Sequence, residues 1–361
     1  MSLTTEQVRA ALQQVVDPAT GQSPLQAGTV KNIAIDGANV SLDIELGYPV
    51  QSRQQALHEH FAQALRAAGA GQVQINLSWR VIAHAVQTGV KLLPQVKNLI
   101  AVASGKGGVG KSTTAVNLAL ALAADGASVG LLDADIYGPS QPTMLGVSGQ
   151  PKSTDGATME PMEGHGIQVS SIGFLVDQET PMVWRGPMVT QALEQLLRKT
   201  RWRELDYLVV DMPPGTGDIQ LTLSQKVPVT GAVIVTTPQD IALLDARRGL
   251  KMFEKVGVPI LGIVENMAMH VCSNCGHVEH IFGEGGGQRM ADEYQVNWLG
   301  SLPLARAIRE QTDAGNPTVA AEPASEAAQA YLAIARKVAG RIAVQARDMS
   351  GKFPTIVVQN T

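Results

Sequence analysis

The sequence predicts an α/β protein in which a doubly wound, mostly parallel sheet follows a small α/β domain. From residue 99 onward, short apolar runs alternate with helical patterns. This alternation is typical of parallel strands joined by crossover helices. A glycine-rich segment separates the first apolar run, residues 99–103, from an alanine- and leucine-rich helical pattern. Residues before 99 carry helix and strand patterns of their own, which indicate a second folding unit.

The chain length fits this division, because 361 residues suit about two domains of roughly 150 residues each. Hydrophobic residues make up 45% of the chain, enough to form a full core. We divide the chain into a small α/β domain, a linker, a main α/β domain and a tail, at residues 1–80, 81–98, 99–345 and 346–361.

The small domain is predicted from capping, turn and periodicity signals. Thr4 is placed to cap a helix, with Gln7 as its capping-box partner, and Asp17-Pro18 stops that helix. Two alternating runs flank the turn Asp36-Gly37-Ala38-Asn39 and predict a hairpin. The predicted strands are 30–35, 40–46 and 73–77, and the second helix is 52–68.

Charge and composition exclude several classes of protein. The net charge is −4 and no basic patch is interleaved with aromatic residues, so nucleic acid is not an expected partner. No apolar run approaches the ~20 residues that span a bilayer, and the N-terminus lacks the features of a signal peptide. The two cysteines cannot form a disulfide framework. We expect a cytoplasmic protein without a membrane partner.

The glycine-rich segment, Gly105 to Ser112, has the G-x-x-x-x-G-K-[ST] pattern of a phosphate-binding P-loop. Its glycines allow successive backbone N–H groups to turn toward a phosphate, and the next helix offers its N-terminus to the same anion. Lys111 is expected to reach the β- and γ-phosphates, and the Ser112 hydroxyl to bind Mg²⁺. The predicted nucleotide-contacting residues here are Gly105, Lys106, Gly107, Gly108, Val109, Gly110, Lys111, Ser112 and Thr113.

Acidic residues follow several of the predicted strands, where ligands of such sheets bind. Asp211 ends an apolar run, as the magnesium-binding Walker B aspartate does. Asp133 and Asp135 follow another strand, and Asp218 ends the loop after Asp211. We therefore expect Asp211 to hold Mg²⁺ together with Ser112.

The second lysine of the loop, Lys106, is not required by a P-loop. The Gly-Lys-Gly-Gly-Val-Gly-Lys-Ser form resembles the deviant Walker A of the MinD, ParA and nitrogenase iron protein class. The resemblance implies a SIMIBI-like P-loop fold, ATP as ligand and a homodimer in which Lys106 crosses to the partner's nucleotide.

The same resemblance implies roles for residues after the other strands. Asp135 would position the attacking water, so Lys106, Lys111 and Asp135 are the candidate catalytic residues, while Asp133 orients the loop. Asp218, in Gly215-Thr216-Gly217-Asp218, would sense the γ-phosphate. Asn266 would read adenine, with Pro238 framing the base. These strand ends carry no Asn-Lys-x-Asp guanine signature, so ATP is preferred to GTP.

Cys272-Ser273-Asn274-Cys275 lies in a polar insert, residues 267–282, with His270, His277 and His280 nearby. Spacing alone leaves four interpretations open and favours zinc among them. Zinc could be held by both cysteines and two histidines. A four-iron cluster needs four thiolates and would have to bridge two chains. A redox dithiol and two thiols without a metal are the remaining interpretations.

Longer stretches of the sequence narrow the choice between these interpretations of the cysteine pair, because they resemble the Mrp/ApbC family of P-loop ATPases. The element order of residues 1–80 is also similar to a small domain of iron–sulfur assembly proteins. The resemblance implies ATP hydrolysis and a labile 4Fe-4S cluster, bridged by Cys272 and Cys275 of two chains and passed to apo-proteins. We expect the hydrolysis to be slow, because the sequence shows no obvious second catalytic arginine near the loop. The alternatives are a MinD/ParA-type positioning ATPase and an ATPase with structural zinc. The resembling strings begin at Gly130, Arg185, Asp211, Val264 and Ile281.

Overall fold

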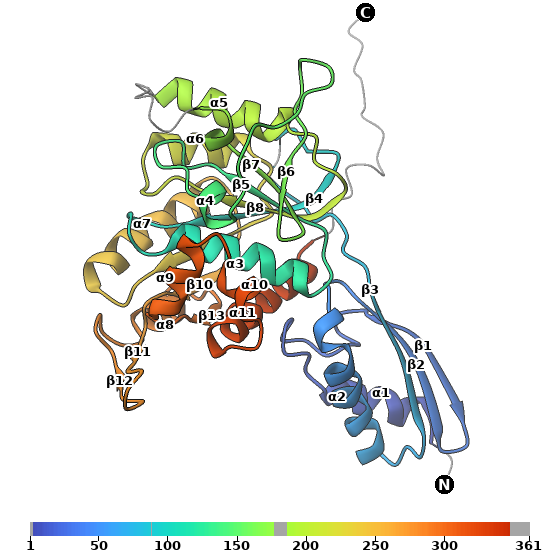
Figure 1. Cartoon of the computed structure of the whole chain (residues 1–361). Helices are drawn as coiled ribbons and strands as arrows, with labels where there is room; N and C mark the ends of the chain where they lie inside the picture. The colour runs from blue at the N-terminus through green and yellow to red at the C-terminus, as the bar shows by residue number, and fades with distance from the viewer. Residues whose placement is uncertain (1–2, 88, 177–185, 347–361) are drawn as a thin grey trace, which may run out of the picture.

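The computed structural model describes residues 3–87, 89–176 and 186–346 and shows an α/β protein with a small and a main unit (Figure 1). A three-stranded sheet lies in the small unit and an eight-stranded, mostly parallel sheet lies in the main unit. The predicted fold class is therefore confirmed. The last fifteen residues of the predicted tail, 347–361, and Arg185 of the family-like strings lie outside the described residues.

The small unit is formed by the local signals noted above. Helix α1 begins after Thr4, whose side chain and that of Gln7 form the predicted capping box. Strand β2 pairs antiparallel with β1 through the predicted turn and parallel with β3. The bounds are α1 Thr5–Gln14, β1 Val30–Asp36, β2 Asn39–Leu46, η1 Gln51–Arg53, α2 Gln54–Ala67 and β3 Val73–Trp79.

The main sheet has the strand order β13-β10-β9-β4-β8-β5-β7-β6, and only the edge strand β6 runs antiparallel to its neighbour. Its central strands are continuous apolar runs because helices cover both faces. The bounds are β4 Val96–Ala103, β5 Val129–Asp133, β6 Met162–Gly164, β7 Ile167–Ser171, β8 Leu205–Asp211, β9 Gly231–Thr236, β10 Ile260–Glu265 and β13 Trp298–Ser301.

Two hydrophobic cores hold these helices on the two faces of the sheet (Figure 1). The first core contains side chains of α3, α9, α10 and α11, with α4 at its edge, and it continues into the small unit. The second contains side chains of α5, α6, α7 and α8. The bounds are α3 Lys111–Ala124, α4 Gln141–Met144, α5 Gly186–Lys199, α6 Asp218–Lys226, α7 Asp240–Lys255, α8 Gly286–Glu293, α9 Arg306–Asp313, α10 Thr318–Ala321 and α11 Glu326–Ala343.

Three features of the main unit differ from the sequence-based expectation. Strand β4 begins at Val96, inside the predicted linker, because Val96 pairs with Leu205 of β8. Strands β6 and β7 were not predicted, since β6 is short and both carry polar residues. The insert forms a hairpin, β11 His270–Val271 and β12 Val278–Glu279. None of the helices in the described ranges is long and apolar enough to cross a membrane.

The two units meet at the C-terminal end of α3, where Asp125 binds residues from both sides. The Arg336 guanidinium on α11 donates from Nε to Asp125 Oδ2 at 2.9 Å and from Nη2 to the Ser52 hydroxyl at 2.8 Å. The Ser52 hydroxyl donates to the Asp125 carboxylate, and the Gln51 N–H donates to the Asp125 carbonyl at 2.9 Å. One buried carboxylate therefore joins the P-loop helix, α11 and the small unit.

Replacing Asp125 by alanine should lower the free energy of unfolding by about 3–5 kcal/mol, because Arg336 would stay largely buried without its anion. Urea unfolding measures the change. The matched control is Glu254→Ala, which removes an ion pair whose side chains are 60% and 42% exposed and should cost at most about 1 kcal/mol. An equal loss of unfolding free energy in the two variants would contradict the role of Asp125 in joining the two units.

Candidate functional site

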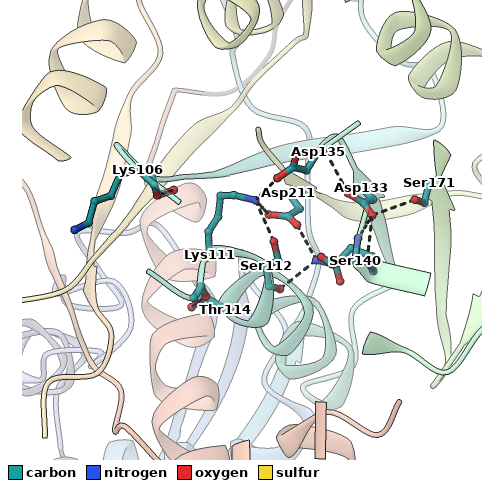
Figure 2. A network of polar contacts seen from close by, with 12 residues as sticks. Lys106, Lys111, Ser112, Thr114, Asp133, Asp135, Ser140, Ser171 and Asp211 are labelled. Atoms are coloured by element: carbon teal, nitrogen blue, oxygen red, sulfur yellow. Dashed lines mark hydrogen bonds and ion pairs between the residues drawn. The ribbon is translucent and has the colours of Figure 1, made fainter. Parts of the chain in front are cut away.

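The candidate nucleotide site lies at the carboxyl ends of β4, β5 and β8 (Figure 2). The register of the sheet pairs Asp211 with Val102 on one side and with Asp133 on the other. The loop after β4 runs directly into α3, so its residues end beside these carboxylates. Parallel strands thus bring together residues that lie far apart in the sequence.

The P-loop has the backbone shape that its glycines predict. Gly110, directly before α3, has a φ of +79°. Residues with a side chain rarely adopt such a positive φ. A Cβ atom at Gly110 would also overlap the Asn266 amide, which donates to the Val109 carbonyl at 2.9 Å. At Gly105 a Cβ would overlap the backbone of Asp245 on α7. Close packing on both sides therefore fixes the path of the loop.

Lys111 turns toward the carboxylates (Figure 2). Its ammonium forms an ion pair with Asp211, and lies 3.1 Å from Ser112 Oγ and 4.0 Å from Asp135 Oδ2. The Lys111 side chain is 6% exposed and that of Asp211 is 0% exposed. Lys111 therefore supplies the positive charge that the buried Asp211 carboxylate needs.

Asp133 organises the loop that follows β5. Its carboxylate accepts hydrogen bonds from the N–H groups of Asp135, Ser140 and Gln141 and from the Ser171 hydroxyl. Burial, followed by the nearby charge of Asp211, raises the pKa of Asp133 to about 7. The contacts fit the loop-orienting role suggested by the resemblance. Sequence reasoning missed Gln141 and Ser171, for which the sequence gives no signal beyond their positions near β5 and β7.

The oxygen atoms around the Lys111 ammonium fit a magnesium ion. Ser112 Oγ and the Asp211 carboxylate both lie beside that single cation, and Mg²⁺ prefers such hard oxygen ligands. Asp135 lies at the edge of the group, and burial raises the pKa of its carboxyl. Within the described residues, buried Gln141 Oε1 has no hydrogen-bond partner. The site thus has the ligand chemistry for Mg²⁺ if Lys111 moves to a phosphate.

Four other predicted nucleotide-site residues lie outside this cluster. The Lys106 side chain points away from Lys111 (Figure 2), as a residue reaching outward would. Asp218 is exposed at the start of α6. Asn266 is buried against the loop, and Pro238 is buried between β9 and α7.

The cysteine pair lies on the β11–β12 hairpin, which projects from the main unit (Figure 1). The Cys272 N–H donates to the His277 carbonyl, and the Gly276 N–H donates to the Cys272 carbonyl, each at 2.9 Å. Cys272 is half-buried and Cys275 is exposed. The N–H groups of Asn274 and then Cys275, followed by the Cys275 side chain, lower the pKa of the Cys272 thiol. The turn therefore favours the thiolate, the form that binds metals.

Two of the three histidines near the cysteines contact backbone carbonyls through Nδ1. His270 Nδ1 lies 3.0 Å from the Leu304 carbonyl, and His280 Nδ1 lies 2.8 Å from the Ala268 carbonyl. Throughout the described ranges, no group of three or more His, Cys, Asp or Glu side chains is placed to hold a metal ion. These described residues therefore present two thiols without a third His, Cys, Asp or Glu side chain placed beside them to hold a metal ion.

The Lys111–Asp211 ion pair can be tested by a double-mutant cycle on nucleotide-free protein. Lys111→Met should lower the free energy of unfolding by about 3–5 kcal/mol, because it leaves Asp211 buried without a cation. Adding Asp211→Asn should restore part of this loss, giving a coupling of at least ~1 kcal/mol in urea unfolding. Additive losses within about 0.5 kcal/mol would show that the two groups do not interact.

Comparison with known families gives two matches that together span most of the chain. Residues 95–339 match the family described as NUBPL iron-transfer P-loop NTPase. Residues 5–77 match the family described as iron-sulfur cluster assembly protein. The first match includes the P-loop, the acidic cluster and the cysteine hairpin.

Curated relatives carry consistent names. An iron-sulfur cluster carrier protein of Pseudomonas fragi is 60% identical over 269 residues, 74% of this chain and 94% of the relative. One from Escherichia coli strain K12 is 59% identical over 288 residues, covering 79% of this chain and 76% of the relative. The iron-sulfur cluster transfer protein NUBPL of Mus musculus is 54% identical and covers 70% of this chain and 80% of the relative.

Solved structures agree with the fold. A nucleotide-binding protein from Archaeoglobus fulgidus, in complex with ADP, is 38% identical with a TM-score of 0.54, and covers 61% of this chain and 87% of that one. The cell division ATPase MinD of Pyrococcus furiosus is 24% identical with a TM-score of 0.51, and covers 67% and 98%. The resemblance inferred from the motifs is confirmed, and the chain belongs to the NUBPL iron-transfer P-loop NTPase family.

Proposed function

We propose that this chain is an ATP-dependent iron–sulfur cluster carrier that delivers clusters to apo-proteins. The observation that carries the proposal is the projecting Cys272-x-x-Cys275 hairpin, which offers an exposed and a half-buried thiol next to a P-loop NTPase unit. The relatives named iron-sulfur cluster carrier or transfer proteins support the same role. A positioning ATPase of the MinD/ParA type accounts for the P-loop but leaves the hairpin without a role.

The cluster is cargo in this proposal, and two copies of the chain hold it. A four-iron cluster takes four thiolates, and each chain supplies two, Cys272 and Cys275. A cluster at a two-fold axis would therefore join two hairpins. The exposure of Cys275 leaves the cargo accessible to an acceptor protein. Cluster binding and dimerisation are then linked, because the ligand binds only the paired chains.

ATP binding would change the partner of Lys111. Its ammonium would leave Asp211 for the β- and γ-phosphates. Ser112 and Asp211 would hold Mg²⁺, whose charge would replace that of the ammonium beside Asp211. The metal supplies neutralisation of phosphate charge. Asp135 orients the attacking water, Asp218 responds to the γ-phosphate, and Lys106 reaches the partner's nucleotide. The ADP-bound relative from Archaeoglobus fulgidus supports a nucleotide at this site.

In this mechanism ATP hydrolysis is slow and sets the state of the dimer. Loops carrying Asp135 and Asp218 take one path with the γ-phosphate and another without it, which shifts how the two chains pair. Because both hairpins belong to the same pair, that shift changes access to the cluster. The nucleotide therefore controls loading or release, while the cysteines hold the cargo.

Anaerobic reconstitution with iron and sulfide tests the carrier function. We expect about one four-iron cluster per two chains, seen by visible absorption, metal analysis and complex mass, and none in Cys272→Ala/Cys275→Ala. The matched control, His277→Ala/His280→Ala, should keep the cluster, since both histidines lie outside the thiolate set. Zinc bound per single chain, without an iron chromophore, would contradict the proposal and favour a structural site.

The thiolate character of Cys272 can be measured separately in the metal-free protein. In a Cys275→Ala variant, the backbone N–H groups of residues 274 and 275 still face the Cys272 sulfur. We expect the rate of iodoacetamide alkylation to rise with pH through a midpoint below the usual ~8.5. The same variant in denaturant serves as control and should return to that usual value. Identical midpoints would show that the folded turn does not stabilise the thiolate.

A further inference from the structure

Gln141 occupies a position that neither the P-loop nor the Walker B strand provides. Its side-chain amide Nε2 donates to Asp211 Oδ2 at 2.8 Å and to the Ser112 carbonyl at 3.1 Å. The side chain is fully buried at 0% exposure. One amide group therefore joins the two residues whose side chains fit a magnesium ion.

The backbone of Gln141 is held as firmly as its side chain. Its N–H donates to Asp133 Oδ2 at 3.1 Å, and the adjacent Ser140 N–H donates to the same oxygen at 3.0 Å. Asp133 also accepts the Ser171 hydroxyl at 3.0 Å. These contacts fix the backbone at the start of α4, and the Gln141 amide reaches Asp211 from that fixed backbone.

The contact with Gln141 differs in kind from the contact with Lys111. The Lys111 ammonium neutralises Asp211 through Oδ1. It must leave that oxygen when it binds a phosphate of the nucleotide. Gln141 is neutral and binds the other carboxylate oxygen, Oδ2, so it can stay in place through that exchange. A carboxylate held by a neutral donor keeps its orientation while its cationic partner changes.

A second observation points the same way. Gln141 Oε1 is buried and, among the described residues, accepts no hydrogen bond. A buried acceptor without a partner is costly, and such atoms are usually satisfied by water or a ligand. Mg²⁺ retains several water ligands when protein side chains hold it. A magnesium-bound water is a suitable donor for this oxygen.

We propose that Gln141 is the positioning residue of the magnesium site: it orients the Asp211 carboxylate against Ser112 and accepts a hydrogen bond from a metal-bound water. The inference rests on the proposed use of Mg²⁺ and ATP by this site. Because Gln141 acts on the metal ligands and not on the phosphates, its loss weakens magnesium-dependent binding selectively. Hydrogen bonds that hold a metal ligand in place change the affinity for the metal by about 10- to 100-fold.

The test measures binding of a fluorescent ATP analogue, first in EDTA and then during a Mg²⁺ titration. Gln141→Leu removes both hydrogen bonds at similar volume, and we expect the half-saturating Mg²⁺ concentration to rise at least about tenfold. Nucleotide affinity in EDTA should stay within about twofold of wild type. Gln141→Asn keeps an amide but is one methylene shorter, so it should also lose magnesium affinity because it cannot reach both partners.

The matched control is Gln87→Leu. Like Gln141, Gln87 makes two hydrogen bonds through its side-chain amide. They join it to the Ser224 carbonyl at 2.8 Å and to the Val229 N–H at 3.1 Å, and neither group belongs to the site. It should leave the magnesium titration unchanged. Thermal melting of every variant reports whether the fold is retained independently of metal binding.

Two results would overturn the role of Gln141. One is a magnesium titration of Gln141→Leu that matches wild type. The other is an equal loss of affinity with and without Mg²⁺, which would make Gln141 a support of the loop as a whole. If magnesium does not change the binding of the ATP analogue to wild-type protein, that result would contradict the proposed function and, with it, the role of Gln141.

Discussion

The buried ion pair between Lys111 and Asp211 is the interaction on which the rest of the site depends. Asp211 has no access to solvent, and its neighbour Asp133 is equally buried, so a cation has to lie between the loop and the strands. The same requirement explains how the site can exchange ligands. In the proposed function, the Lys111 ammonium moves to a phosphate of the nucleotide, and Asp211 would then need another cation, a charge that a bound magnesium ion would supply. Nucleotide and metal binding would be coupled through this exchange of charge.

The sequence predicted the parts of the fold that depend on local patterns. The capping box at Thr4 and the hairpin of β1 and β2 both follow from short-range signals. The P-loop could also be placed, because Gly110 must adopt a positive φ where the strand becomes a helix. Strands β6 and β7 escaped prediction because tertiary pairing, not an apolar run, makes them strands.

Contacts between distant residues were harder to predict from the sequence. Asp133 and Asp211 are neighbours only because β5 and β8 pair in register, and no spacing in the chain reveals this. Gln141 was missed for the same reason, since a single glutamine after a serine carries no motif. At the cysteine hairpin, spacing alone favoured zinc, and only the resemblance to a known family favoured an iron–sulfur cluster. The structure adds that, among the described residues, no group of three or more His, Cys, Asp or Glu side chains is placed to hold a metal ion.

Helix α3 touches the candidate phosphate site at its first turn and is bound through Asp125 to Arg336 and Ser52 just beyond its last. Both ends are therefore fixed in rotation about the helix axis. Inserting or deleting one residue in α3 would turn one end by about 100° relative to the other, because a turn takes 3.6 residues. Such a change would force the chain to give up either the loop geometry or the contact with the small unit. The length of this helix is thus constrained more tightly than its composition.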